Sequence, residues 1–583
     1  MKLSPRPSPA LAAAILALSC LVASKDASAG LDVDLDGVEG QEKINVESFL
    51  AIRRYAATKE AAASRIRHLH EQAPEDIAKA LEPFGYFRVQ VDGSLEQDGD
   101  DWKATYRIDP GEPVRFDTVT VRLVGDGAED PILQDVVATF PVQLGDPVNH
   151  LDWELGKANI SGQAHVRGYL DGRFQTNEIV VDLERYAARL MLVYDTGARY
   201  EYGPVRFEQD VLDQRYLDGY VPFEQGDSLD FQELRGFQNS LRSTNYFKRV
   251  EVEPVRDEAV GNQVPIQVIL EPNRPLKLDF GVSYGTDEGF GALVGALVRR
   301  VNRRGHRADA EIRVAQTKQS AAANYRIPWA NPPTSILSFS TGYERDDTES
   351  RLSETFLVAT SFARLRGSWQ ETIALAYRNE TYEVGPDAGR SGLFGPDLQW
   401  SLIRADNRVF TRRGFRVRAG LHGSLDGALA SVTYGQANLD LKGILGGKSP
   451  HRMIGRAKVG HTFSDQFREL PASIRYFAGG AQSIRGYGYE AITPRNASGE
   501  PIGGENLLET GVEYDYRLLG SWAVAGFYDL GGALESFSDA LSHGVGFGLR
   551  WLSPVGMIRL DYAWGLSTPG VPTYIHFMIG PDL

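Results

Sequence analysis

The carboxyl-terminal half of the chain alternates between large apolar residues and small or charged ones. In residues 545–551, one face carries Val545, Phe547, Leu549 and Trp551, and the other carries Gly546, Gly548 and Arg550. Residues 557–566 repeat this pattern, and the alternation continues less distinctly over residues 573–580. Successive side chains of a β-strand point to opposite faces. An aromatic, apolar face opposed to glycine and charge is typical of a barrel wall with lipid outside and a polar lumen inside.

Glycine-rich segments of this kind begin after Pro272-Asn273-Arg274-Pro275 and continue to the end of the chain. At about ten residues per tilted strand plus turns, the region from Leu276 to Leu583 holds roughly sixteen strands. No apolar run after the first 30 residues approaches the ~20 residues that a membrane helix needs. Because an open sheet would leave backbone groups unpaired in lipid, we predict a transmembrane antiparallel β-barrel.

The amino terminus has the layout of an export signal. Lys2 and Arg6 precede an apolar run over residues 10–22, and Ala27-Ser28-Ala29 supplies the small residues of a cleavage site. We therefore predict a signal peptide over residues 1–29. Its removal would take away three basic residues and one acidic residue, so the net charge of −15 would become −17. This acidity argues against a nucleic-acid partner.

The chain has a single cysteine, Cys20, which lies within the predicted signal. A lipid anchor on Cys20 is disfavoured because Ala17 stands where an apolar residue such as leucine is needed. Without the signal, the chain would have neither disulfides nor thiolate chemistry.

The region upstream of the barrel contains an internal repeat. Gly85-Tyr86-Phe87, Gly168-Tyr169-Leu170 and Asn245-Tyr246-Phe247 each follow a helix-like run and open a strand. Their spacing of about 80 residues is long enough for each unit to bury a small core of its own. We predict three small α+β modules before the barrel.

These modules resemble the polypeptide-transport-associated (POTRA) domains, in which one strand, two helices and two strands follow in order. Three of them before a barrel resemble the BamA/TamA outer-membrane assembly superfamily, and most closely its TamA branch, the translocation and assembly module subunit. The resemblance implies an outer-membrane protein of a Gram-negative cell with its modules in the periplasm. The expected divisions are a signal peptide at 1–29, POTRA-like modules at 30–112, 113–200 and 201–273, and the barrel at 274–583.

A long connection separates the strand that ends near Phe463 from the strand that begins near Leu507. Its roughly 40 residues far exceed the ~12–15 beyond which an unstructured connection is usually functional. It contains Ser483-Ile484-Arg485-Gly486-Tyr487, which resembles the Val-Arg-Gly-Phe/Tyr motif that the superfamily carries on a loop folded into the lumen. A later strand contains Phe527-Tyr528-Asp529-Leu530-Gly531, which matches the superfamily's Phe-x-Asp-x-Gly.

The resemblance implies that Arg485 pairs with Asp529 and with Glu513. A guanidinium can satisfy two carboxylates through its fork of donors, so this contact would hold the loop inside the barrel. Gly486 would let the backbone approach the wall closely, and Tyr487 would add a rigid apolar contact.

The first and last strands form a second candidate site. Gly281 and Gly285 weaken the first strand, because glycine contributes no side chain to pairing. Gly580 precedes a proline, which has no backbone donor and interrupts a ladder. We therefore predict a weak seam between these strands, although glycines at barrel ends also relieve curvature.

Signals of catalysis are missing from the sequence. Gly447-Lys448-Ser449 is similar to a phosphate loop, but Lys442 occupies the position of its first glycine. The histidines have no metal-ligand spacing, and His68 and His70 are expected on a solvated helix face. We expect no enzymatic activity, no catalytic residues, no cofactor and no metal.

The resemblance implies an assembly or translocation factor that inserts or secretes unfolded β-rich outer-membrane clients, such as autotransporters, by lateral opening of its barrel. The implied partners are these clients, outer-membrane lipid and a TamB-like subunit that spans the periplasm. Two alternatives stay open. One is a two-partner-secretion exporter, which usually has two modules and a plug helix. The other is a porin-like solute channel with periplasmic adaptors, in which the long loop would be a constriction.

Overall fold

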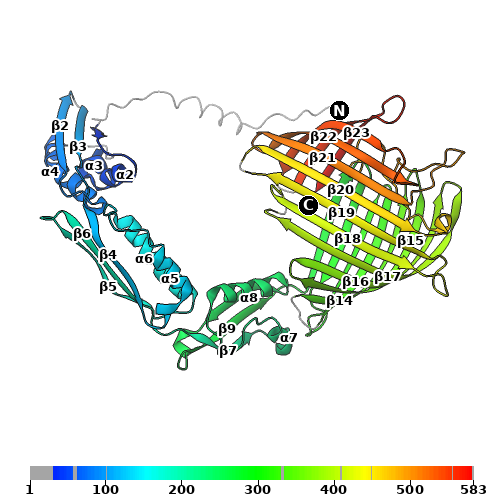
Figure 1. Ribbon diagram of the computed structural model, residues 1–583, viewed down its shortest axis with the longest axis horizontal. Helices are drawn as coiled ribbons and strands as arrows, with labels where there is room; N and C mark the ends of the chain where they lie inside the picture. Colours follow the sequence, from blue (N-terminus) through cyan, green and yellow to red (C-terminus); the bar gives the residue numbers. More distant parts are fainter. Residues whose placement is uncertain are drawn as a thin grey trace, which may run out of the picture. The chain divides into compact units, whose positions relative to one another are not determined.

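A computed structural model of the chain describes residues 31–56, 62–99, 101–329, 334–407, 410–447, 449–553 and 556–580. Three small α+β modules precede a sheet of sixteen consecutive antiparallel strands (Figure 1), which confirms the predicted fold class. The predicted signal peptide at 1–29 lies outside the described residues.

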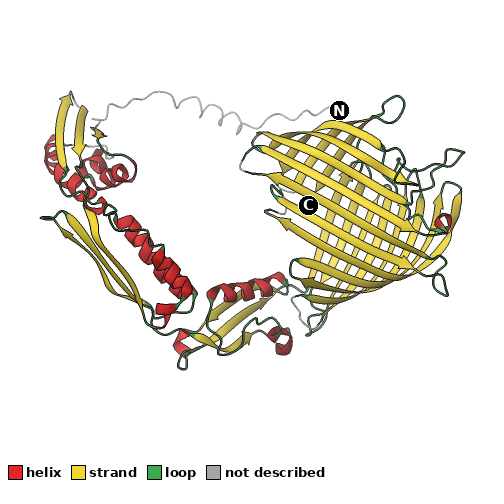
Figure 2. Cartoon of the chain, viewed as in Figure 1, coloured by secondary structure: helices red, strands yellow, loops and turns green. Residues whose placement is uncertain are grey.

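Each module is a three-stranded sheet covered by helices (Figure 2). Module 1 comprises β1 (Leu31–Asp36), α2 (Gly40–Phe49), α3 (Ala51–Ala56), α4 (Ala63–Leu81), β2 (Gln90–Asp98) and β3 (Asp101–Asp109). Module 2 comprises β4 (Arg115–Val124), α5 (Pro131–Ala138), α6 (His150–Val166), β5 (Arg173–Asp182) and β6 (Ala187–Asp195). Module 3 comprises β7 (Glu201–Glu208), α7 (Gln214–Asp218), α8 (Phe231–Ser243), β8 (Phe247–Pro254) and β9 (Gln263–Pro272). In every module the last strand lies in the middle of the sheet.

The repeated Gly-Tyr or Asn-Tyr pair follows the last helix of each module and has the same backbone conformation each time. The backbone φ is +85° at Gly85, +86° at Gly168 and +59° at Asn245. A helix commonly stops at a residue in this left-handed region, where glycine is unstrained and asparagine is the usual substitute. The internal repeat is therefore a repeated helix stop that turns the chain into the next strand.

One helix residue of module 1 is placed differently from the expectation. His68 is exposed on α4, as predicted, but His70 is partly buried and its Nδ1 lies 2.9 Å from Tyr106 Oη. Burial lowers the pKa of His70 below its ordinary value. The expectation of a solvated helix face was wrong for His70, because it lies four residues after Ile66 and three before Ala73, which are both buried, and so shares the apolar face of α4 that packs on the sheet.

The barrel strands are longest in the middle of the sequence and shorter at both ends. They are β10 (Leu276–Gly285), β11 (Gly289–Val298), β12 (Arg307–Ala315), β13 (Lys318–Pro328), β14 (Ser335–Asp347), β15 (Leu352–Arg366), β16 (Trp369–Val384), β17 (Asp387–Ala405), β18 (Gly414–Ser424), β19 (Tyr434–Gly446), β20 (His451–Phe463), β21 (Asn506–Leu519), β22 (Trp522–Leu534), β23 (Ser542–Ser553), β24 (Gly556–Gly565) and β25 (Thr573–Gly580).

The alternation read from the sequence separates two environments. Phe280 and Phe547 are 76% and 59% exposed on the outer face, whereas Arg550 on the inner face is fully buried. Among the described residues, no helix is both long enough and apolar enough to cross a membrane. The outer strand faces carry the apolar surface that a bilayer covers.

Module 3 contacts one end of the barrel. The hydroxyl of Tyr246 donates to the carbonyl of Gly305 at 2.5 Å, in the connection between β11 and β12, and accepts from Nε of Arg307, the first residue of β12, at 2.9 Å. Arg303 of the same connection pairs with Asp213 at 3.1 Å. By the topology that the resemblance implies, this is the periplasmic end, and the connection between β20 and β21 lies at the opposite end.

Candidate functional site

The candidate site is built by the long connection between β20 and β21, residues 464–505, which we call the lumen loop. Its predicted motif is buried, with Ile484, Arg485 and Tyr487 only 0%, 5% and 6% exposed. A loop whose central side chains are buried must satisfy their polar groups within the protein.

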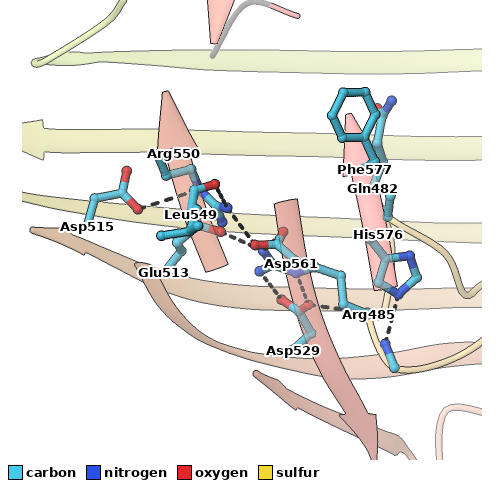
Figure 3. A network of polar contacts seen from close by, with 12 residues as sticks. Gln482, Arg485, Glu513, Asp515, Asp529, Leu549, Arg550, Asp561, His576 and Phe577 are labelled. Carbon is cyan, nitrogen blue, oxygen red and sulfur yellow. Dashed lines mark hydrogen bonds and ion pairs between the residues drawn. The ribbon is translucent and has the colours of Figure 1, made fainter. Parts of the chain in front are cut away.

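Arg485 meets three carboxylates that come from three strands (Figure 3). Its Nε and Nη2 donate to the two oxygens of Asp529 on β22, at 2.7 and 3.1 Å. Its Nη1 donates to Glu513 on β21 at 2.6 Å and to Asp561 on β24 at 3.2 Å. The two carboxylates expected from the resemblance thus lie around Arg485, and Asp561 is an additional partner that the sequence analysis did not assign.

Two further arginines belong to the network, and Asp515 lies at its edge, 3.9 Å from Arg550 (Figure 3). Arg550 on β23 donates to Glu513 at 2.9 Å and to Asp561 at 2.5 Å, and Arg456 on β20 contacts Asp529 at 2.8 Å. We call these six side chains the lumen ion cluster: Arg456, Arg485, Glu513, Asp529, Arg550 and Asp561. Alternation had already placed Arg550 opposite the apolar face, but spacing along the chain does not reveal which charges meet across strands.

The glycines of both motifs are required by their backbone environment. Gly486 has φ +92°, and a Cβ there would lie 2.4 Å from the carbonyl carbon of Trp564. Gly531 has φ +147°, and a Cβ there would lie 1.9 Å from the carbonyl oxygen of Leu508. Only glycine fits such positions without moving the neighbouring strand.

The aromatic residues of the two motifs hold the loop from both sides. The guanidinium carbon of Arg485 lies 3.4 Å from the ring centroid of Phe527, a cation–π arrangement. The hydroxyl of Tyr487 donates to the carbonyl of His543 at 3.0 Å and accepts from the backbone N–H of Ser567 at 3.0 Å. Ser483, the first motif residue, donates its hydroxyl to Glu509.

The lumen loop is also attached to the wall far from the ion cluster. Glu490 accepts two hydrogen bonds from Arg351, each of 2.9 Å, in the connection between β14 and β15. The backbone N–H of Ala481 donates to Asp287 at 2.9 Å, in the turn between β10 and β11. Burial raises the pKa of Asp287 to about 6. The loop therefore contacts the first hairpin of the barrel as well as its last strands.

The predicted seam lies between β10 and β25. Within the described residues, the order of the sheet runs from β10 to β25 and no ladder joins these two strands. They meet near one end, where the N–H of Thr286 donates to the carbonyl of Phe577 at 3.3 Å and the N–H of Phe577 donates to the Thr286 hydroxyl at 3.3 Å. The rings of Tyr284 and Phe577 lie 5.6 Å apart.

The three predicted seam glycines differ in how close they lie to the opposite strand. A Cβ at Gly285 would lie 3.8 Å from the carbonyl of Phe577, so Gly285 adjoins the contact between the two strands. The nearest atom to a Cβ at Gly281 belongs to Leu293 of β11, and a Cβ at Gly580 would meet nothing within 4 Å. A hollow of about 600 Å³ lined by Gly281, Met578 and Ile579 separates the strands there.

In the described ranges, no group of three or more His, Cys, Asp or Glu side chains has the arrangement of a metal site. The carboxylates of the ion cluster face arginines instead, and charge-assisted bonds of this kind are strong in a desolvated setting. The arrangement is suited to holding a loop in place.

Comparisons with known proteins agree with this architecture. Residues 301–581 match the Omp85 superfamily domain, and residues 32–110 match POTRA domain 1 of TamA. The chain is 26% identical over 374 residues to the outer membrane protein assembly factor BamA of Nitratidesulfovibrio vulgaris, a match that covers 59% of this chain and 45% of that protein. This chain thus spans about half the length of that relative.

A solved structure shares the fold. The crystal structure of BamA from Haemophilus ducreyi lacking POTRA domains 1–3 superposes with a TM-score of 0.67 and 16% identity, covering 79% of this chain and 99% of that one. The likeness extends over most of the described chain.

Proposed function

The chain belongs to the BamA/TamA superfamily, with an Omp85 barrel in the outer membrane and POTRA modules in the periplasm, and we propose that it inserts or secretes β-rich outer-membrane proteins, autotransporters included. In this proposal, clients pass through a lateral opening between β10 and β25. The observation that carries the proposal is the seam. Among the described residues no ladder joins the two strands that should close the barrel, and their contacts gather around Phe577, which meets Tyr284 and Thr286.

An open seam offers two strand edges. Each edge has a row of N–H and C=O groups without a ladder partner, and such a row is a template for an incoming strand. A client segment that pairs with these edges would satisfy its own backbone groups before it enters lipid. The free energy of client folding would drive the process, and no nucleotide is needed.

The lumen loop would set how readily the seam opens. It contacts the first hairpin through Asp287 and the last strands through Arg485, so it bridges both sides of the seam. A loop held by the ion cluster would keep these two sides in a fixed relation. Release of the loop would let them move independently.

The proposed periplasmic partner is a TamB-like subunit that docks on module 1. The match of residues 32–110 to the first POTRA domain of TamA supports this assignment. Three modules before the barrel disfavour the two-partner-secretion alternative, which usually has two. The buried loop motif disfavours the porin alternative, because its side chains fill part of the lumen rather than line a wide passage.

A disulfide across the seam tests the proposal. Thr286→Cys with Phe577→Cys would join β10 to β25 at their contact, and the only native cysteine is Cys20. The matched control is Ser283→Cys with Gly291→Cys, which joins β10 to β11 within an existing ladder. A Cβ at Gly291 would lie 2.6 Å from Ser283 Oγ, close enough for this bridge.

Client insertion into vesicles should stop in the oxidised seam variant, return after reduction and continue in the oxidised control. A channel needs no seam, so its conductance would be the same with and without the bridge. Undiminished insertion under near-complete crosslinking of the seam would rule out lateral opening and favour a passive pore.

A further inference from the structure

A row of outward-facing positions across five barrel strands contains a glycine pair where large residues are expected. The direct cross-strand partners along this row are Arg404, Phe415, Gly443, Gly455 and Val512, from β17 to β21. The alternate residues of the same strands face the lumen, as the contact of Arg456 with Asp529 shows. The row therefore lies on the lipid side.

The glycine pair leaves a hollow in that surface. A Cβ built at Gly443 or at Gly455 would have no other atom within 4 Å, so open space lies above both. Larger cross-strand pairs stabilise a sheet, and glycine in a strand interior often marks a close approach by a ligand or another backbone. Neither glycine is required by the backbone, because neither has a positive φ.

The hollow has walls of apolar side chains and a volume of about 740 Å³. Phe415 and Val512 flank the glycine floor, and Leu445 pairs with Met453 beside it towards the periplasmic end. These four side chains are between 40% and 69% exposed. The volume lies within the ~300–1,000 Å³ of typical ligand sites, and the lining suits a hydrocarbon chain.

Two arginines stand at the periplasmic edge of this hollow, Arg404 at the end of β17 and Arg413 just before β18. Both are exposed, and the guanidinium of Arg404 donates to Ser368 Oγ at 3.2 Å. Asp406 also lines the edge, but its carboxylate accepts the backbone N–H groups of Asn407 and Arg412 at 2.9 and 3.0 Å. The arginines therefore present positive charge beside an apolar hollow.

We propose that this hollow is a binding site for one glycerophospholipid of the periplasmic leaflet. An acyl chain would lie over Gly443 and Gly455, and the phosphate would meet Arg404 and Arg413. A guanidinium matches a phosphate through paired donors, and long cationic side chains at a barrel rim reach the headgroup level. The site is separate from the lumen ion cluster and from the seam.

Substitution at the glycine floor tests the site directly. Gly443→Leu places a side chain in the open space without a clash, so the barrel should fold normally. Gly526→Leu is the matched control. Gly526 is exposed where Gly443 is partly exposed. It lies between Tyr514 and Phe547 in the sheet and would have no atom within 4 Å of a Cβ, but it is outside the hollow.

The readout is native mass spectrometry of the full-length, detergent-purified protein titrated with dioleoyl phosphatidylglycerol. The wild type and the Gly526→Leu variant should bind one lipid with the same affinity. Gly443→Leu should bind it about tenfold more weakly, the loss expected when contact with roughly two methylenes is displaced. Arg404→Gln with Arg413→Gln should weaken binding of this phospholipid but leave binding of uncharged dioleoylglycerol unchanged.

Three results would overturn the assignment. Equal lipid binding by Gly443→Leu and the wild type would show that the hollow holds no lipid. If the double arginine variant lost affinity equally for the phospholipid and for dioleoylglycerol, the arginines would not bind the phosphate. A dimer that dissociates on Gly443→Leu substitution, with no change in lipid binding, would assign the hollow to a second copy of the chain instead.

Discussion

Replacement of Arg485 by alanine is the sharpest test of how the lumen loop is held. The change removes the donors that reach Asp529, Glu513 and Asp561 while leaving the barrel strands intact. We expect the loop to detach around residue 485 and client assembly to fall, in a barrel that still folds.

The magnitude follows from what remains after the substitution. Breaking a buried ion pair by removing one partner typically costs about 3–5 kcal/mol. Asp529 would keep Arg456 at 2.8 Å, and Glu513 would keep Arg550 at 2.9 Å, so neither carboxylate loses all compensation. We therefore expect a loss at the low end, about 3 kcal/mol, which weakens local loop docking on the order of 100-fold.

Limited chymotrypsin cleavage after Tyr487 and Tyr489 measures this docking, because Tyr487 is only 6% exposed in the closed loop. Cleavage of Arg485→Ala should be much faster than that of the wild type. Arg485→Lys should give an intermediate rate, since an ammonium keeps the charge but not the fork. Arg495→Ala is the matched control, because this loop arginine is exposed and donates to the carbonyl of Gly499.

A double-mutant cycle shows whether the two residues act together. Asp529→Ala should also loosen the loop, and the effect of Arg485→Ala with Asp529→Ala should be smaller than the sum of the single effects. Wild-type cleavage in Arg485→Ala, or full additivity in the double variant, would refute the view that this pair holds the loop.

Three further outcomes are expected. Gly486→Ala should release the loop at a cost of roughly 1–3 kcal/mol, because its φ of +92° and the adjacent strand backbone exclude a Cβ, whereas Gly488→Ala should be cleaved by chymotrypsin like the wild type. Burial raises the pKa of Asp287, so its contribution to stability is present below its ordinary pKa of 3.8 and is lost as the pH rises through about 6. Wild-type loop cleavage, measured relative to cleavage of an unfolded reference substrate at the same pH, should therefore increase from about pH 5 to pH 7.5, and Asp287→Asn should reduce that increase. A cysteine at the exposed Ser498 should react with an impermeant maleimide on intact cells. Reaction only after the outer membrane is opened would show that the barrel has the opposite orientation in the membrane.

Alternation and turn spacing were sufficient to predict the barrel. The faces of β23 and β24 could be read residue by residue, because lipid outside and charge inside impose opposite chemistry on neighbouring positions. The three modules followed from a repeated pair, of which Gly168-Tyr169 is one copy, since the same helix stop needs the same left-handed residue each time.

The network around Arg485 could be predicted only in part. The resemblance named Asp529 and Glu513. Asp561 and Arg550 join them because of the register between neighbouring strands, and this register cannot be predicted from the residue spacing within one strand. His70 was misplaced for a different reason. It lies four residues after Ile66 and three before Ala73, so helical spacing puts it on the buried face of α4, where it meets Tyr106 of the sheet.

The sequence separations of the loop contacts imply an order of folding. Arg485 reaches its carboxylate partners across 28, 44 and 76 residues, whereas Ala481 reaches Asp287 across 194 and Phe577 reaches Thr286 across 291. Short chain closures lose less entropy and form sooner. The last strands can therefore assemble around the loop as a local nucleus, and the first hairpin joins afterwards. The contact between Thr286 and Phe577 then forms last. The last strand pair to meet during folding is therefore also the pair that no ladder joins among the described residues.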